Sequence, residues 1–410
     1  MKVIAIADSD SYLKWGAAFL GALSATEVGS ADRELILIET PVLPSESQRV
    51  AALAVGGVAP EQLRCLPLPD VLDTVRRERP DAVLIALRGP VAAVLIRMLA
   101  ALPDRPVLVT GLPGISIPAT RKALAFRRQA DLFVLHSRRE IREFTRMSRE
   151  YGWTHRFALA TLPFVEKRTG ARGTDLVFAA QAVVPRARDD RRQLLELLIA
   201  AAVADPRCRV VIKVRAVAGE QQTHVEDASY PELLDEFAAA GGEVPKNLVV
   251  STEPMSVALD HAQGLMTVSS TAAIEAIARG IPVIALDSFG ISDRLINPVF
   301  EGSGLFGGEE AVVRREFRHP ADRWLDDNYF HPAEADDVSV QLAALVAARR
   351  QGVLPAREPA RKSGGRLRLA WDRKRAFGDA DRTVSGAVAL AVGTPARQAV
   401  VMARKVKRAL

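Results

Sequence analysis

The stretch GLMTVSSTAAIEAIARGIPVIALDSFG, Gly264–Gly290, contains the elements of one strand–helix–strand unit. Two apolar runs of strand length, Leu265–Val268 and Ile281–Leu286, flank a segment whose apolar residues fall on one side of a helix. Continuous apolar runs of this length are typical of strands buried on both faces of a parallel sheet. The stretch therefore predicts an α/β fold with parallel strands and crossover helices.

Three consecutive hydroxyl residues, Ser269, Ser270 and Thr271, are predicted at the junction between the first strand and the helix. The free backbone N–H groups of a helix's first turn favour an anion, and short hydroxyl side chains add hydrogen bonds without blocking its approach. The same hydroxyls also serve as helix caps. Two interpretations stand at this point: a phosphate-binding turn and a simple capped helix.

Apolar strands alternate with helical segments through the rest of the chain, which predicts two parallel sheets covered by helices. The predicted strands of the first half are Lys2–Ala7, Glu34–Ile38, Ala82–Leu87, Val107–Thr110 and Leu132–His136. The second half adds Asp175–Ala179, Arg209–Val214 and Asn247–Ser251 before the two strands above. We expect two Rossmann-like domains, 1–165 and 172–350, joined near the polar segment Thr161–Thr174 and facing a ligand-binding crevice.

Length and composition fit two folded domains. The chain has 410 residues and 49% hydrophobic content, enough for two buried cores. Cys65 and Cys208 belong to no CxxC or Cys/His cluster, so we expect neither a metal site nor a disulfide framework. The start MKVIAIADSD suits a first strand and not a secretory signal, and no segment offers about 20 uninterrupted apolar residues. These features predict a cytoplasmic protein.

The C-terminal segment 355–410 is strongly basic. It carries 14 Lys and Arg against 4 Asp and Glu, a net charge of +10 within a chain of net charge +6. Leu367, Leu369, Trp371 and Phe377 lie among these cations, a composition suited to an anionic membrane surface. A solvated tail is the alternative. No nucleic-acid-binding module is present, so we expect no nucleic-acid partner.

The segment SSTAAIEAIARGIPVIALD resembles the donor-binding segment of GT-B glycosyltransferases, especially those that build bacterial capsule and other surface polymers. The shared features are the hydroxyls, an acid within the helix (Glu275), a glycine at the helix end (Gly280) and a Pro-Val-Ile strand. The resemblance implies that Ser269, Ser270 and Thr271 hold the phosphates of a nucleotide-sugar. It implies that Glu275 binds a ribose or the sugar.

Further donor-side residues follow from the same resemblance. Gln181 occupies the turn that similar transferases place beside the donor. Lys213, Arg215 and His224 resemble the strand-end segment whose cation and histidine contact donor phosphate, although the usual Lys-Pro-His-Pro order is absent. Together they would neutralise a nucleotide leaving group. Surface charges and a loop histidine are the alternative interpretation.

The N-terminal domain is expected to hold the acceptor and the catalytic base. Its first strand runs into Asp8 and Asp10, and carboxylates at a strand end can deprotonate an acceptor hydroxyl. Asp10 can equally cap the next helix. Gly114 and Ser116 lie in TGLPGISIPAT, which resembles the glycine-bearing loop near the reacting centre of polymer-forming transferases. His136, at another strand end, is an alternative base.

The predicted activity is an inverting transfer of a sugar from a nucleotide-activated donor to a surface glycan or lipid-linked acceptor. Retaining enzymes of this fold commonly carry a second glutamate eight positions before the one matched by Glu275, and Thr267 stands there. We expect no cofactor and no metal. Two alternatives stay open: a nucleotide-sugar 2-epimerase of the same fold, and a non-catalytic nucleotide- or glycan-binding protein.

Overall fold

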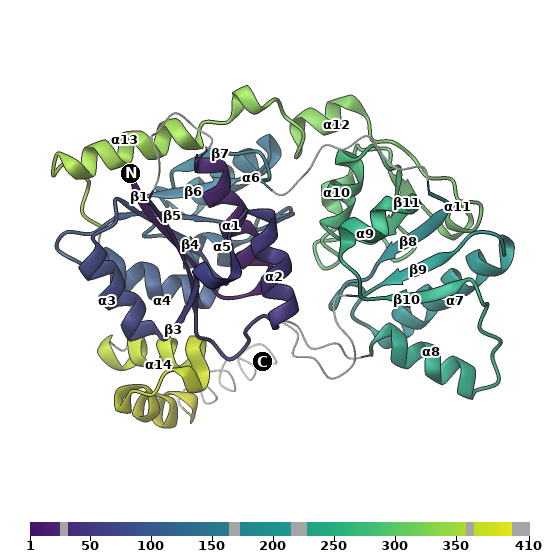
Figure 1. The fold of residues 1–410 in the computed structure, drawn as a ribbon, viewed down its shortest axis with the longest axis horizontal. Coiled ribbons are helices and arrows are strands. Elements are labelled where there is room, and N and C mark those ends of the chain that lie inside the picture. The colour runs from purple at the N-terminus through teal and green to yellow at the C-terminus, as the bar shows by residue number, and fades with distance from the viewer. Residues whose placement is uncertain (25–31, 164–172, 215–227, 358–364, 396–410) are drawn as a thin grey trace, which may run out of the picture.

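The computed structural model describes residues 1–24, 32–163, 173–214, 228–357 and 365–395. Its N-terminal domain is built on a seven-stranded sheet with the order β3-β2-β1-β4-β5-β6-β7 (Figure 1). All neighbouring strands in it are parallel. The strands are β1 (Lys2–Ala7), β2 (Asp32–Ile38), β3 (Leu63–Leu66), β4 (Ala82–Ala86), β5 (Val107–Gly111), β6 (Leu132–Leu135) and β7 (Phe157–Leu159).

The C-terminal domain repeats this plan with six parallel strands in the order β10-β9-β8-β11-β12-β13. These strands are β8 (Asp175–Ala179), β9 (Val210–Lys213), β10 (Leu248–Ser251), β11 (Ala262–Thr267), β12 (Val283–Leu286) and β13 (Phe306–Gly307). Its helices are α7 (Arg188–Ala204), α8 (Tyr230–Ala239), α9 (Met255–Asp260), α10 (Ala272–Ala278) and α11 (Glu309–Val313). Gly280, with φ of 70°, supplies the left-handed turn that ends α10.

Strand order fixes where a ligand can bind in each domain. In both sheets the order reverses direction beside the first strand of the domain, between β1 and β4 and between β8 and β11. Loops leaving the carboxyl ends of such a strand pair diverge to opposite faces of the sheet and open a crevice. The predicted α/β fold of two Rossmann-like domains is confirmed.

Helices cover both faces of the N-terminal sheet. They are α1 (Asp10–Ser24), α2 (Glu46–Val55), α3 (Leu68–Glu78), α4 (Gly89–Ala100), α5 (Arg121–Phe126) and α6 (Arg138–Glu150). Alternate residues of β1 serve the two faces: Val3 and Ala5 pack with α1, whereas Ile4 and Ile6 pack with α3 and α4. Figure 1 shows α1 and α2 on the side of the sheet that faces the C-terminal domain.

After the second sheet the chain returns to the N-terminal domain. Arg142 of α6 donates to Asp327 of α12 (Asp322–Asp327) at 2.7 Å, and α13 (Val338–Arg350) packs across β5, β6 and β7. The predicted range 172–350 groups α13 with the second sheet, and the structure differs on this point. A helix that follows the last strand of one domain looks the same in sequence whichever sheet it covers.

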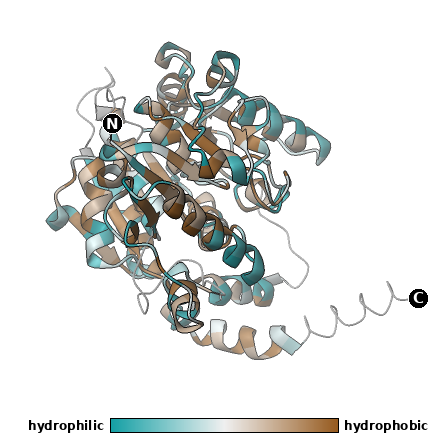
Figure 2. Ribbon diagram, turned by 90° about the vertical axis from the view of Figure 1, so that its right-hand side faces the viewer, coloured by the Kyte–Doolittle hydropathy of each residue, from teal (hydrophilic) through white to brown (hydrophobic). Residues whose placement is uncertain are grey.

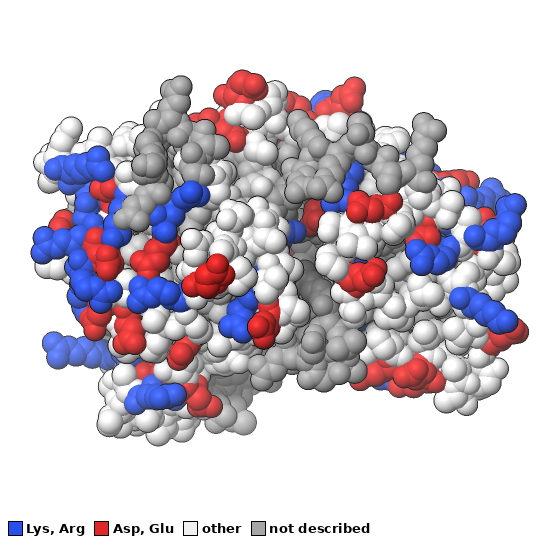
Figure 3. Space-filling view, viewed as in Figure 1, with Lys and Arg blue, Asp and Glu red and all other residues white. Residues whose placement is uncertain are grey.

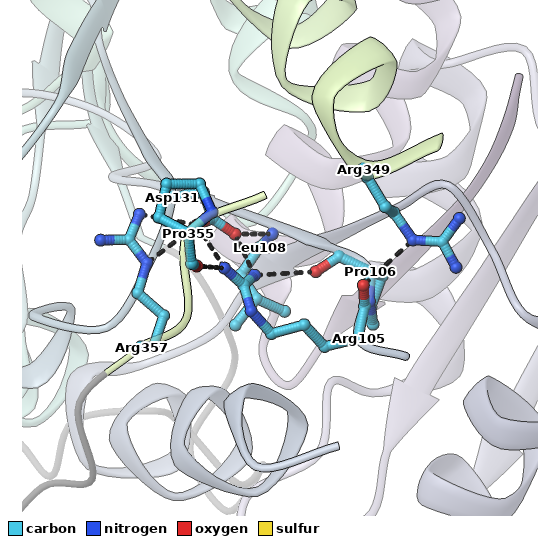
Figure 4. Close-up of polar contacts among 7 residues, drawn as sticks. All are labelled: Arg105, Pro106, Leu108, Asp131, Arg349, Pro355 and Arg357. Atoms are coloured by element: carbon cyan, nitrogen blue, oxygen red, sulfur yellow. Dashed lines mark hydrogen bonds and ion pairs between the residues drawn. The ribbon is translucent and has the colours of Figure 1, made fainter. Parts of the chain in front are cut away.

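A buried carboxylate holds the segment after α13 against the N-terminal domain (Figure 4). Asp131 accepts hydrogen bonds from Arg105 at 2.6 and 3.0 Å and from Arg357 at 2.6 and 2.8 Å. It also accepts one from the Leu108 amide at 2.8 Å. Arg105 in turn donates to the Pro355 carbonyl at 2.6 Å. Two guanidinium groups from distant parts of the chain therefore share one anion.

The described part of the basic segment is folded onto the N-terminal domain. Helix α14 (Gly365–Phe377) packs against α4, and Phe377, 1% exposed, joins the apolar core beneath α3 and α4. Trp371 is 7% exposed and packs against Ala389 of a further helix, 384–395. Trp371 and Phe377 therefore pack within the protein, whereas Leu367 is 44% exposed. None of the described helices is long and apolar enough to cross a membrane.

Candidate functional site

A cavity of about 350 Å³ lies between the two domains at the carboxyl ends of their strands. Figure 3 shows charges of both signs on the described surface of both halves of the molecule. The N-terminal domain lines the cavity with Asp10, Ser11, Lys14, Ser47, Gln48, Ala51 and Pro113. The C-terminal domain contributes Ala180, Lys213, Thr252, Glu253, Pro254, Met255, Ser270, Thr271, Ala272 and Glu275.

The turn from β11 to α10 presents two hydroxyls to this cavity. The Ser270 hydroxyl accepts a hydrogen bond from the Ala272 amide at 3.2 Å, so it caps the helix locally and still lines the cavity. Thr271 occupies the N-cap position, but its side chain makes no capping bond. Its hydroxyl instead accepts from the Ile115 amide of the N-terminal domain at 3.5 Å. Capping and ligand binding are therefore compatible at this turn.

Ser269 and Gln181 support that turn from behind. The Ser269 amide donates to Gln181 Oε1 at 3.0 Å, and Gln181 Nε2 donates to the Ser269 hydroxyl at 3.2 Å. Neither residue lines the cavity. Thr267 adds a third hydrogen bond to the turn, because its hydroxyl accepts from the Ser270 amide at 3.1 Å. Hydrogen bonds of Gln181, Ser269 and Thr267 therefore connect the ends of β8 and β11 and stabilise the β11–α10 turn. None of these three residues lines the cavity.

Lys213 ends β9 beside this turn and is 7% exposed. Its ammonium group donates to the Val214 carbonyl and lines the cavity. Glu253, after β10, lies on the same wall. The predicted donor ligands Arg215 and His224 lie outside the described residues. Of the three residues predicted to contact the leaving group, Lys213 is the one whose position the structure describes, and it lines the cavity.

Asp10 and Lys14 face the donor-side turn from helix α1. Asp10 is the first residue of α1 and lines the cavity. Lys14 Nζ lies 3.2 Å from Glu275 Oε1 of α10, an ion pair that joins the two domains. The Glu275 carboxylate, predicted to bind a ribose or the sugar, is therefore paired with Lys14 here. A donor that contacts Glu275 would share it with Lys14 or replace that pairing.

Asp8 differs sharply from Asp10. Its side chain is fully buried, and its carboxylate accepts from Arg88 Nε at 2.9 Å and from the Arg88 amide at 3.2 Å. Burial raises the pKa of the Asp8 carboxyl, against the opposing effect of the Arg88 guanidinium. Asp8 joins the β1 and β4 strand ends and is not among the cavity-lining residues. It supports the acceptor side without contacting the cavity.

His136 is held inside the N-terminal domain and does not reach the cavity. Its Nε2 accepts from the Trp15 indole at 2.8 Å, and its Nδ1 lies 2.8 Å from the Ala160 carbonyl. The side chain is fully buried, and burial lowers the pKa of the imidazole. With both ring nitrogens engaged, His136 has no lone pair directed at an acceptor hydroxyl. This geometry does not support His136 as the base.

The loop after β5 approaches the donor-side turn closely. A side-chain Cβ on Gly114 would lie 2.6 Å from Thr271 Oγ1, so only glycine fits without displacing Thr271. The Ser116 amide donates to Glu140 Oε1 at 3.0 Å, and Tyr329 donates to the same oxygen at 2.6 Å. Gly114 thus meets the donor turn, whereas Ser116 is fastened to a buried carboxylate behind the loop.

Sequence reasoning missed Ser47 and Gln48, which line the cavity from the first turn of α2. The segment Ser45–Gln48 forms a capping box, which is a sequence signal for the start of a helix. That signal does not reveal which face of the domain the helix covers. No group of three or more potential metal ligands occurs within the described ranges.

The arrangement of the two domains and their cleft is that of GT-B proteins. The structure of UDP-GlcNAc 2-epimerase from Methanocaldococcus jannaschii, in complex with UDP-GlcNAc and UDP, is similar: TM-score 0.55, 12% identity, covering 84% of this chain and 99% of that one. A structure described as "putative UDP-N-acetylglucosamine 2-epimerase" from Listeria monocytogenes has TM-score 0.52, 13% identity, and coverage of 93% and 98%. At such low identity these similarities establish the fold. No curated protein matches the sequence.

The chain belongs to the family described as "Putative glycosyltransferase (DUF6716)", which matches residues 3–345. The match spans both sheets and α13. It includes every described residue that lines the cleft cavity. The family and the GT-B fold agree with the class predicted from Gly264–Gly290.

Proposed function

We propose that this protein transfers a sugar from a nucleotide-activated donor to a surface glycan or lipid-linked acceptor, with inversion. The observation that carries the proposal is the composition of the cleft cavity. One wall offers Ser270, Thr271 and the Lys213 ammonium, which suit phosphate oxygens. The opposite wall offers the Asp10 carboxylate, which suits proton removal from a hydroxyl.

In this mechanism Asp10 takes the proton of the acceptor hydroxyl as its oxygen forms a bond to the anomeric carbon. The bond from that carbon to the nucleotide phosphate breaks, and its electron pair stays on the phosphate oxygen. Lys213 and the hydroxyls of Ser270 and Thr271 stabilise the resulting negative charge. A single displacement inverts the anomeric centre. Thr267, which stands where retaining relatives carry a glutamate, bonds to the β11–α10 turn instead.

We also propose that the reaction takes place in the cytoplasm at a membrane surface, where a lipid-linked acceptor is presented. The net charge of +10 over residues 355–410 supports this, because anionic leaflets attract basic segments. The donor would be a substrate, with no resident cofactor or metal.

The test is a turnover assay with methanol as the surrogate acceptor, because a methyl glycoside does not mutarotate. Purified protein is incubated with UDP-, GDP-, CMP- and dTDP-sugars, and the product is followed by proton NMR. We expect slow release of one nucleotide together with a methyl glycoside of inverted anomeric configuration. Retained configuration would contradict the single displacement.

The same assay separates the alternatives. A 2-epimerase would yield the C2 epimer of the sugar. An epimerase of this fold is expected to use acids and a histidine in the cleft. Among the described lining residues there is no histidine. A non-catalytic binding protein would bind a nucleotide and give no product, and that outcome would overturn the proposed transfer.

A further inference from the structure

A second cavity, of about 280 Å³, lies between α4 and α14 and shares no lining residue with the cleft. Each helix contributes one stripe of residues spaced three and four apart, as expected for two facing helices. The aromatic rings of Phe126 and Trp371 and the side chains of Ala93 and Val94 make much of its wall apolar. We call it the α4–α14 cavity.

Three arginines and one aspartate line the α4–α14 cavity, which leaves an excess of positive charge. Arg368 pairs with Asp372 at 3.0 Å. Arg375 stacks on the Trp371 ring at 4.8 Å, and within the described ranges it forms no ion pair with a carboxylate. Arg97 of α4 is half-buried. Burial lowers the pKa of its guanidinium group, against the opposing effect of the Asp372 carboxylate.

The one carboxylate of the cavity, Asp372, is paired with Arg368 and is shared among three arginines. Partly desolvated guanidinium groups in excess of the carboxylates are unfavourable, and a bound anion would compensate them. Arginine matches phosphate oxygens with parallel N–H donors. The apolar wall suits the chain attached to such a phosphate. We infer that the α4–α14 cavity binds the phosphate group of an anionic lipid.

The neighbouring helix, 384–395, favours a lipid over a soluble phosphate ester. Its inner side packs on α14: Ala389 clusters with Trp371, and a Cβ on Gly393 would lie 2.4 Å from the Trp371 ring. Val384, Val388 and Val392 follow one side at intervals of four and are 80%, 51% and 54% exposed. Figure 2 shows this helix, pale and brown, at the edge of the molecule. An exposed apolar stripe beside arginines is the pattern of an interfacial helix.

Co-sedimentation of the full chain with vesicles tests the inference independently of sugar transfer. The vesicles contain phosphatidylcholine with or without phosphatidylglycerol. The double variant Arg97→Gln, Arg375→Gln removes two of the three cavity arginines and leaves the Arg368–Asp372 pair. The control, Arg366→Gln, Arg382→Gln, removes two exposed arginines of the same region that lie outside the cavity. Ala93→Phe fills the cavity without changing the charge.

We expect the wild type to bind phosphatidylglycerol vesicles, and the cavity double variant to bind roughly tenfold more weakly than the control double variant. Ala93→Phe should weaken binding as the cavity double variant does. Equal losses in both double variants would show diffuse electrostatic attraction and overturn the site. Binding to pure phosphatidylcholine vesicles as tight as to those with phosphatidylglycerol would overturn the anionic lipid as the ligand.

Discussion

Asp8 and Asp10 show how two residues of one loop acquire different chemistry. The Asp8 side chain points into the domain and meets Arg88, because its position continues the alternation of β1. Asp10 begins α1 and lines the cleft cavity. Because only Asp10 meets the cavity, it is our candidate base, whereas Asp8 holds the β1 and β4 strand ends together.

Asp10→Asn should therefore abolish transfer and leave nucleotide binding intact. General-base catalysis typically contributes about 10²–10⁴-fold, so kcat should fall by a factor in this range. The measurements are turnover and nucleotide affinity of the same preparation. Asp8→Asn is the matched control: Asp8 is a neighbouring carboxylate that does not line the cavity, so its substitution should leave turnover measurable. Unchanged turnover in Asp10→Asn would exclude it as the base.

One buried histidine, His136, and one half-buried histidine, His155, should make the protein less stable in mild acid. Burial lowers the pKa of His136 and of His155, whereas in the unfolded chain both titrate near pH 6.5. Below that pH the unfolded state binds more protons than the folded state, so the free energy of unfolding falls as pH falls. The slope is at most about 1.4 kcal/mol per pH unit for each histidine. Urea unfolding at a series of pH values measures this slope. A flat profile would contradict lowered pKa values of the two imidazoles.

The sequence could predict the cavity-lining residues Asp10, Lys213, Ser270 and Thr271, because each stands at or shortly after a strand end, and Glu275 from the resemblance of its segment to a donor-binding motif. It could not predict that His136 is unavailable. A strand-end side chain can point to the crevice or to the core, and here Trp15, distant in sequence, decides the outcome. One sequence can predict where a residue lies along a strand. It cannot predict which distant side chain that residue will contact.

At the scale of elements, the central strands were predictable and some edge strands were not. β1, β4 and β8 are almost wholly buried, so their apolar runs stand out. β3, β7 and β13 lie at sheet edges and have two to four residues each. β3 is partly exposed along its length, and its sequence LRCL has no long apolar run. Short, half-solvated strands give little periodic signal.

Helix α14 illustrates a basic segment that is structural. Phe377→Ala should destabilise the protein by about 3–5 kcal/mol, because it empties a site in the core beneath α3 and α4. Leu367→Ala, on the same helix but 44% exposed, should change stability by at most about 0.5 kcal/mol. Urea unfolding of both variants provides the comparison. Equal and small effects would mean that α14 is not docked in solution.

At the scale of the whole molecule, the cleft depends on contacts between domains that no local pattern encodes. Lys14 and Glu275 are 261 residues apart in sequence, and Ile115 and Thr271 are 156 apart. The segment that follows the second sheet makes a further contact, because Tyr329 donates a hydrogen bond to buried Glu140 of the N-terminal domain at 2.6 Å. The strand series predicts that two domains exist, but their relative placement follows from these pairings.

The central claim is that the cleft binds a nucleotide through the β11–α10 turn and Lys213. Thermal unfolding with UDP, GDP, CDP, CMP and dTDP tests it, because a ligand of the folded state stabilises by about 2.7 kcal/mol at 100 times its Kd. We predict that one nucleotide raises the Tm, and that Ser270→Ala and Lys213→Ala reduce the rise while Asp10→Asn preserves it. A rise that survives both donor-side substitutions, or no rise with any nucleotide, would contradict the assignment of this cleft.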